Sequence, residues 1–204
     1  MSICSNEFDA ERLPFDLQIM KAKYIVFVMF ILVVGSMAFA VDVDGVLKDG
    51  EYSKDAVFDK GNFRLYWEFQ GDKVFMAIVA KTPGWIAIGF EPSMVMANSD
   101  MIFGLVGEPG EVQAVDAWST GLFGPHSPDV NQGGASSILL FAGTRTGDMV
   151  VFEFSRLLNT GDKFDKVIPM SGNFKVIWAY GPNLQFTAKH SKAGNAVLKM
   201  EGGN

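Results

Sequence analysis

Short β-prone runs separated by turn residues recur along most of this chain. Each run is five to seven residues long: 63–69, 74–80, 85–90, 100–106, 112–118, 138–142, 149–154, 174–180, 184–188 and 196–200. This is the usual length of a strand, and about ten strands at this spacing predict an all-β sandwich or barrel. No stretch keeps a helical apolar period long enough for a crossover helix, which argues against a parallel nucleotide-binding sheet. One short helical turn is predicted at 155–159.

The N-terminal part carries the pattern of an export signal. Lys21 and Lys23 precede the apolar run 24–35, and residues 36–40 end in an A-x-A pattern. We predict a signal peptide at 20–40 that is cleaved after Ala40, because the apolar run is shorter than the about twenty residues of a membrane span. The alternative is an uncleaved anchor on the same side of the membrane. Residues 1–19 fit no leader and are interpreted as a misannotated N-terminal extension.

One β domain is therefore predicted at 41–204, periplasmic or secreted, with no membrane span after signal cleavage. The formal net charge is −6 and no basic cluster is visible, which argues against nucleic acid. The only cysteine, Cys4, precedes the domain, which excludes a disulfide, a thiolate nucleophile and covalent haem attachment within it. Two histidines, His126 and His190, are too few for a zinc site, and no G-x-S-x-G motif supports a hydrolase. We expect a binding protein and not an enzyme.

Residues 119–136 form a long polar segment rich in glycine and proline, which is typical of a functional or mobile loop. His126 lies inside this segment, and we interpret it as a surface histidine of the loop. Calcium is a secondary alternative, because extracytoplasmic β-sandwiches can hold it and the chain offers carboxylates at Asp100, Asp116, Asp129 and Asp162. However, the chain has no Asp-x-Asp-x-Asp-Gly loop.

Sulfur and imidazole groups occur at the ends of two separate predicted strands. Met94, Met96 and Met101 surround the polar break after the strand that ends at Phe90, and His190 follows the strand 184–188. Methionine with histidine is an axial pair for haem iron in electron-transfer proteins. The alternatives are a gap-filling core residue for Met96 and a surface histidine for His190.

Several motifs together carry a family resemblance. The run 84–90 (GWIAIGF), the Met96 to Asp100 stretch, and the segments 152–162, 176–181 and 190–194 resemble, in order, the DOMON family. The resemblance covers nearly all of 41–204. It implies an immunoglobulin-like antiparallel β-sandwich of about ten strands, whose ligand in this family is b-type haem or a sugar.

The haem-binding branch of this family includes the cytochrome domain of cellobiose dehydrogenase, and the resemblance implies its iron ligands here. A methionine of the first motif and a histidine of the last correspond to Met96 and His190, with Met94 as a substitute. Family histidines are often followed by an Arg-Gly pair, where this chain has Ala193-Gly194 preceded by Lys192. Since one relative uses lysine as a ligand, Lys189 and Lys192 are also candidates.

The sequence therefore predicts a domain that holds one non-covalent haem b and relays single electrons to a redox partner protein or membrane cytochrome. Lys189 or Lys192 would balance the propionates. A carbohydrate-binding module that stacks sugars on Trp118 or Phe123 is the alternative, and a purely structural interaction domain is a third. The apolar slot for the haem is expected to include Trp85, Phe90, Met94, Met101, Phe103, Trp178, Tyr180 and Phe186.

Overall fold

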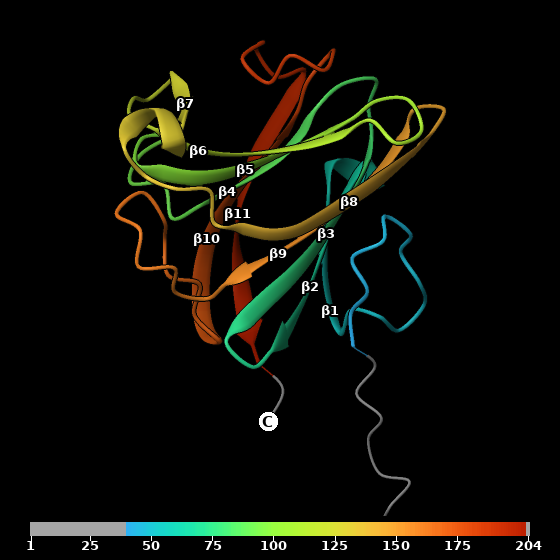
Figure 1. The fold of residues 1–204 in the computed structure, drawn as a ribbon, viewed down its shortest axis with the longest axis horizontal. Helices are drawn as coiled ribbons and strands as arrows, with labels where there is room; N and C mark the ends of the chain where they lie inside the picture. The colour runs from blue at the N-terminus through green and yellow to red at the C-terminus, as the bar shows by residue number, and fades with distance from the viewer. Residues whose placement is uncertain (1–39, 203–204) are drawn as a thin grey trace, which may run out of the picture. The chain divides into compact units, whose positions relative to one another are not determined.

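Two antiparallel sheets pack face to face in the computed structural model, which describes residues 40–202 (Figure 1). The five-stranded sheet has the order β1 (Lys54–Phe58), β2 (Phe63–Gln70), β3 (Lys73–Lys81), β9 (Met149–Leu157) and β8 (Ile138–Thr146). The six-stranded sheet has the order β11 (Lys192–Glu201), β10 (Ser171–Tyr180), β4 (Ile86–Phe90), β5 (Ser99–Val106), β6 (Val112–Ser119) and β7 (His126–Pro128). This confirms the sandwich. The predicted extension 1–19 lies outside the described residues, as does the predicted signal 20–40 except for Ala40.

Two predicted elements are wrong. The segment 155–159 is not a helical turn, because β9 continues to Leu157 and pairs with β3 over its whole length. The segment 184–188 is not a strand; it belongs to the connection between β10 and β11. The edge strands β1 and β7 and two short 3-10 helices, η1 (Asp59–Gly61) and η2 (Asp129–Gln132), were not predicted.

The main core lies between the sheets and follows from the alternation of apolar residues along the strands. Phe63 and Trp178 meet across the interface with ring centroids 5.2 Å apart, and Phe90 stacks on Phe174 at 5.7 Å. All four side chains are buried. Full burial of an aromatic or large aliphatic side chain contributes about 1.5–3 kcal/mol, so packing between the sheets contributes several kcal/mol to the stability of the fold.

Strands β4 and β5 are buried on both faces, which is unusual for a sandwich, where one face of each sheet meets solvent. All their residues are buried, whereas β11 alternates between exposed and covered positions. Along β5, Asp100 and Ile102 face the other sheet, while Met101, Phe103 and Leu105 face outward. Other segments of the chain must therefore cover the outer face of the six-stranded sheet at β4 and β5.

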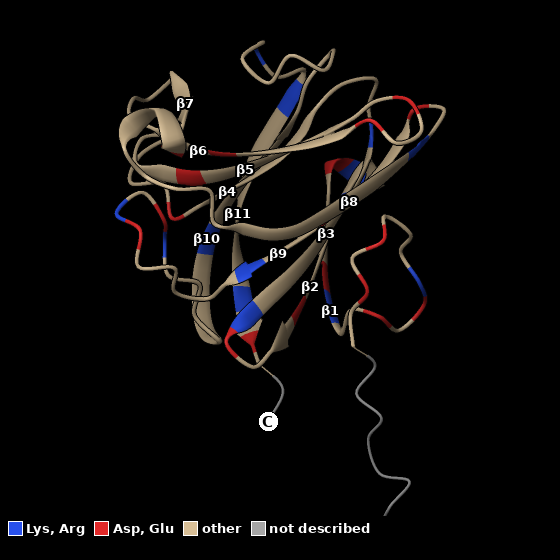
Figure 2. Ribbon diagram, in the orientation of Figure 1, with Lys and Arg blue, Asp and Glu red and all other residues tan. Residues whose placement is uncertain are grey.

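Lysine and arginine residues are distributed over several strands and loops, and the described residues carry no continuous basic stretch (Figure 2). Within residues 40–202 there is no helix with the length and apolar character that crossing a membrane requires.

Candidate functional site

A second group of buried apolar side chains covers the outer face of β4, β5, β6 and β10. We call this group the outer cluster. Its members are Trp85, Ala87, Met101, Phe103, Leu105 and Ala117, with Met96, Val115, Ile177, Ala179 and Phe186 partly buried against them. It is separate from the main core, because strand alternation places its side chains on the opposite side of the sheet.

Phe103 lies at the centre of the outer cluster and contacts three other rings. Trp85 meets it edge-on at 5.3 Å between centroids, Phe186 lies at 5.4 Å and the imidazole of His126 at 6.0 Å. Phe186 comes from the connection 181–191 between β10 and β11, whereas His126 begins β7. These two segments, distant in sequence, form the layer that covers the sheet.

Backbone hydrogen bonds fix the connection 181–191 over the sheet. Trp85 N donates to Asn183 O at 2.9 Å, and Gly181 N donates to Trp85 O at 2.8 Å. A Cβ atom at Gly181 would overlap the Trp85 indole, so this close approach requires glycine. Ser191 N donates to Tyr180 O at 2.8 Å and closes the connection. His190 therefore lies at a fixed point beside the start of β11.

The two imidazoles lie close enough to influence each other. Burial lowers the pKa of His126, and the positive charge of His190 lowers this pKa further. His126 Nδ1 is buried and makes no hydrogen bond within the described residues. The sequence analysis assigned His126 to a surface loop, and the structure instead brings it to the outer cluster. No spacing motif signals this position, because it depends on the pairing of His126 with Ser119 of β6.

The three methionines near the β4–β5 connection have different environments. Met101 is 4 % exposed inside the outer cluster, and Met96 packs against its edge. Met94 is 62 % exposed in a turn in which Ala97 N donates to Met94 O at 2.9 Å. The structure therefore brings Met96 and Met101 to the cluster and leaves Met94 outside it.

Several residues expected in one common slot lie elsewhere. Phe90 and Trp178 belong to the main core, and Tyr180 packs against that core, on the opposite side of the sheet from Met101. The prediction of a single slot is wrong for these three. Lys192 is the cross-strand partner of Tyr180, and its amine lies 3.6 Å from Asp59 Oδ1 on that side. Lys189 is exposed.

The edge of the outer cluster is hollowed. A shallow depression of about 480 Å³ is lined by Leu105, Gly107, Gly110, Glu111, Val112, Gln113 and Leu184. Leu105 belongs to both the depression and the cluster, so the depression borders the outer cluster at this residue.

The aromatic residues considered for sugar stacking differ in exposure. Trp118 is half-buried, with Phe164 at 6.0 Å between centroids and the Lys166 amine 4.9 Å above its ring. Phe123 is 83 % exposed. Of the two, only Phe123 presents a free ring face.

Three of the four aspartates considered for calcium are buried: Asp100, Asp116 and Asp129. Asp162 differs, because its carboxylate accepts hydrogen bonds from Ala135 N at 2.8 Å and Phe164 N at 2.9 Å. Asp165, which the sequence analysis did not single out, turns inward instead. Burial raises the pKa of Asp100 to about 7 and the pKa of Asp129 to about 8.

Comparison with known proteins identifies a domain family that matches this chain. A profile of the DOMON domain matches residues 59–181. DBH-like monooxygenase protein 1 of Homo sapiens is 26% identical over 145 residues, which covers 71% of this chain and 21% of that protein. The Mus musculus protein of the same name is 32% identical over 130 residues, covering 63% and 20%. This chain thus spans about a fifth of these relatives.

Two solved structures are similar to this chain. The cytochrome b domain of pyranose dehydrogenase from Coprinopsis cinerea superposes with a TM-score of 0.54 at 16% identity, covering 72% of this chain and 81% of that chain. The cytochrome domain of Myriococcum thermophilum cellobiose dehydrogenase gives a TM-score of 0.49 at 9% identity, covering 74% and 81%.

Proposed function

Because this chain belongs to the DOMON domain family, we propose that residues 41–204 form an exported domain that binds one haem b and relays single electrons. The observation that carries the proposal is the outer cluster, a buried apolar surface outside the main core that has thioether and imidazole groups at its edges. Support also comes from the fold shared with the cytochrome b domain of pyranose dehydrogenase.

The chemistry of the outer cluster fits a porphyrin. Trp85, Phe103 and Phe186 offer apolar and aromatic surface, as non-covalent cofactor sites do. Met96 supplies a thioether packed against the cluster, His126 supplies an imidazole beside Phe103, and His190 lies close enough to His126 to lower its pKa. Phe186 and His126 fill the space beside Phe103 in this structure, so haem binding there would require these side chains to move.

The residues of the chain have defined roles in this proposal. Met96 and His190 are the proposed axial ligands, and His126 is an additional imidazole that the structure adds to the candidates. When bound, the haem would supply a one-electron couple whose potential depends on the ligands and on the dryness of the pocket. The described residues hold the group, exclude water and orient the ligands. The domain itself is proposed to be non-catalytic.

The partner is proposed to be a redox protein or membrane cytochrome, met in a brief encounter over a small area. We propose that the predicted signal peptide directs the domain to the periplasm or outside the cell. The relatives are named as monooxygenases, but this chain spans only about a fifth of their length.

An absorption spectrum tests the proposal directly. The exported protein, purified with added hemin, should show a low-spin spectrum that sharpens on reduction with dithionite. Met96→Ala and His190→Ala should each abolish the low-spin bands. Met94→Ala is the matched control, because its side chain is exposed and lies outside the outer cluster.

The same experiment separates the candidate imidazoles. If His126→Ala loses the low-spin bands and His190→Ala keeps them, His126 is the ligand. A protein that stays colourless with hemin and binds sugars would instead favour the carbohydrate-binding alternative, with Phe123 as the stacking ring.

A further inference from the structure

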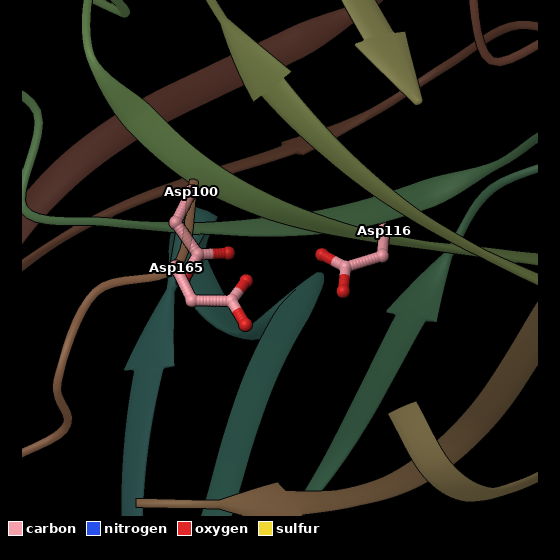
Figure 3. A group of neighbouring side chains, drawn as sticks. All are labelled: Asp100, Asp116 and Asp165. Carbon is pink, nitrogen blue, oxygen red and sulfur yellow. The ribbon is translucent and has the colours of Figure 1, made fainter. Parts of the chain in front are cut away.

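Three aspartate side chains converge in the interior beside β5 and β6, a fourth buried aspartate lies near them, and their combined charge is not balanced. We call Asp100, Asp116, Asp129 and Asp165 the acidic group. The ligand oxygens of Asp100, Asp116 and Asp165 lie within 4.8 Å of one another. Figure 3 shows these three carboxylates pointing toward a shared space.

Most oxygens of the acidic group have no hydrogen-bond donor. Asp100 Oδ1, Asp116 Oδ1 and both oxygens of Asp165 are buried without a partner among the described residues. The other oxygens of Asp100 and Asp116 are satisfied: Asp100 Oδ2 accepts from Lys166 N at 2.8 Å and Asp116 Oδ2 accepts from Ser137 N at 2.6 Å. Asp100 and Asp116 are therefore each anchored through one oxygen, whereas Asp165 has no hydrogen bond to either oxygen within the described part of the chain.

Asp129 is an independent observation, because it comes from η2 and is not one of the three converging carboxylates. Its side chain is 0 % exposed and both of its oxygens lack a partner. Pro128 pairs with Ala117 of β6, so the next residue, Asp129, lies beside Asp116 on the neighbouring strand. A buried carboxylate without any donor is costly.

One cation within the described residues contacts the acidic group. Arg156 Nη1 donates to Asp100 Oδ2 at 2.7 Å, and Arg156 Nη2 lies 3.7 Å from Asp165 Oδ2. One guanidinium cannot neutralise four carboxylates. Buried charges are normally paired or coordinate metals.

We propose that Asp100, Asp116 and Asp165, with Asp129 beside them, bind one hard divalent cation, for which calcium is the best fit. The donors are all oxygens, which suits calcium and magnesium and not softer metals. Calcium bonds oxygens at about 2.3–2.6 Å, so oxygens up to about 5 Å apart can share one ion, whereas the shorter magnesium bonds require a tighter group.

The bound ion would join four parts of the chain. Asp100 is the second residue of β5, Asp116 lies in β6, Asp129 begins η2, and Asp165 lies in the connection between β9 and β10. Because η2 follows β7 directly, the ion would also fix the segment that carries His126 over the outer cluster. The cation site and the outer cluster thus lie on opposite faces of the same two strands.

Calcium titration of the full chain tests this proposal. After treatment with EGTA, the protein should bind one calcium per chain by isothermal titration calorimetry, and its thermal midpoint should rise with calcium concentration. Terbium gives a second readout, because Trp118 is the cross-strand partner of Asp100 on the same face and should sensitise its luminescence. Excess calcium should remove that signal.

Two conservative variants locate the site. Asp129→Asn and Asp165→Asn should each weaken calcium binding at least tenfold, while Asp55→Asn, an exposed aspartate of β1, should leave binding unchanged. Both site variants remove a buried charge, so they should fold without calcium. The proposal is overturned if millimolar calcium gives neither binding heat nor a thermal shift, or if binding persists unchanged in both variants. Protonated carboxylates would then account for the group.

Discussion

Replacement of Arg156 by methionine tests the electrostatics of the acidic group. The side chain is fully buried, and its guanidinium donates to Asp100 Oδ2 at 2.7 Å and to Lys166 O at 3.1 Å. Methionine fills a similar volume and offers no donor. In EGTA, Arg156→Met leaves the carboxylates of Asp100 and Asp165 without their cation.

The loss of stability can be estimated from this geometry. Removing one partner of a buried ion pair destabilises a protein by about 3–5 kcal/mol. At about 2–4 °C per kcal/mol for a domain of this size, the thermal midpoint of Arg156→Met should fall by about 6–20 °C. Thermal unfolding followed by circular dichroism in EGTA measures this shift.

An exposed arginine provides the control. Arg64 lies on β2 with its side chain in solvent, so Arg64→Met should change stability by less than about 0.5 kcal/mol. A loss under about 1 kcal/mol in Arg156→Met would refute the reasoning, because it would mean that the buried carboxylates are neutral. Calcium should raise the midpoint of Arg156→Met more than that of the unmodified protein, since the competing cation is gone.

Three further substitutions test other parts of the sandwich. Gly104→Ala places a Cβ atom into the Phe152 ring between the sheets, and urea unfolding should show a loss of about 1–3 kcal/mol. Burial raises the pKa of Glu153 above its ordinary value of 4.5, so the folded protein holds this proton more tightly and loses stability as the pH rises through the raised value. Glu153→Gln should flatten that part of a stability profile measured against pH. Arg145 donates to the carbonyl oxygens of Val106, Thr82 and Gly84, and Arg145→Lys, which cannot reach all three, should lower the free energy of unfolding by about 1–3 kcal/mol.

The sequence predicted the buried strands well because their signals are local. Strands such as β3 and β5 combine continuous apolar runs with flanking turn residues, and both properties are visible without knowing the partner strand. The edge strands β1 and β7 are only partly buried, so their residues carry little apolar pattern. The apolar residues of 184–188 indicated a strand, but Phe186 there packs onto a sheet instead of pairing within one.

The candidate site was harder to predict because it depends on which face each residue occupies. Phe90 and Met101 are close along the chain and face opposite sides of the sheet. Asp162 and Asp165 are the same residue type three positions apart, and only the path of the backbone decides that Asp162 accepts hydrogen bonds from loop amides while Asp165 turns inward. His126 reaches the outer cluster through a hairpin whose register the sequence does not reveal.

The two-sided burial of β5 also limits how the preceding turn can vary in length. Asp100 and Met101 are consecutive and face opposite sides, so an insertion that slipped β5 by one residue relative to β4 would exchange the two faces. The carboxylate would then enter the apolar layer, and the thioether would enter the polar interior. Substitutions in residues 91–98 should therefore be tolerated far better than insertions or deletions of a single residue there.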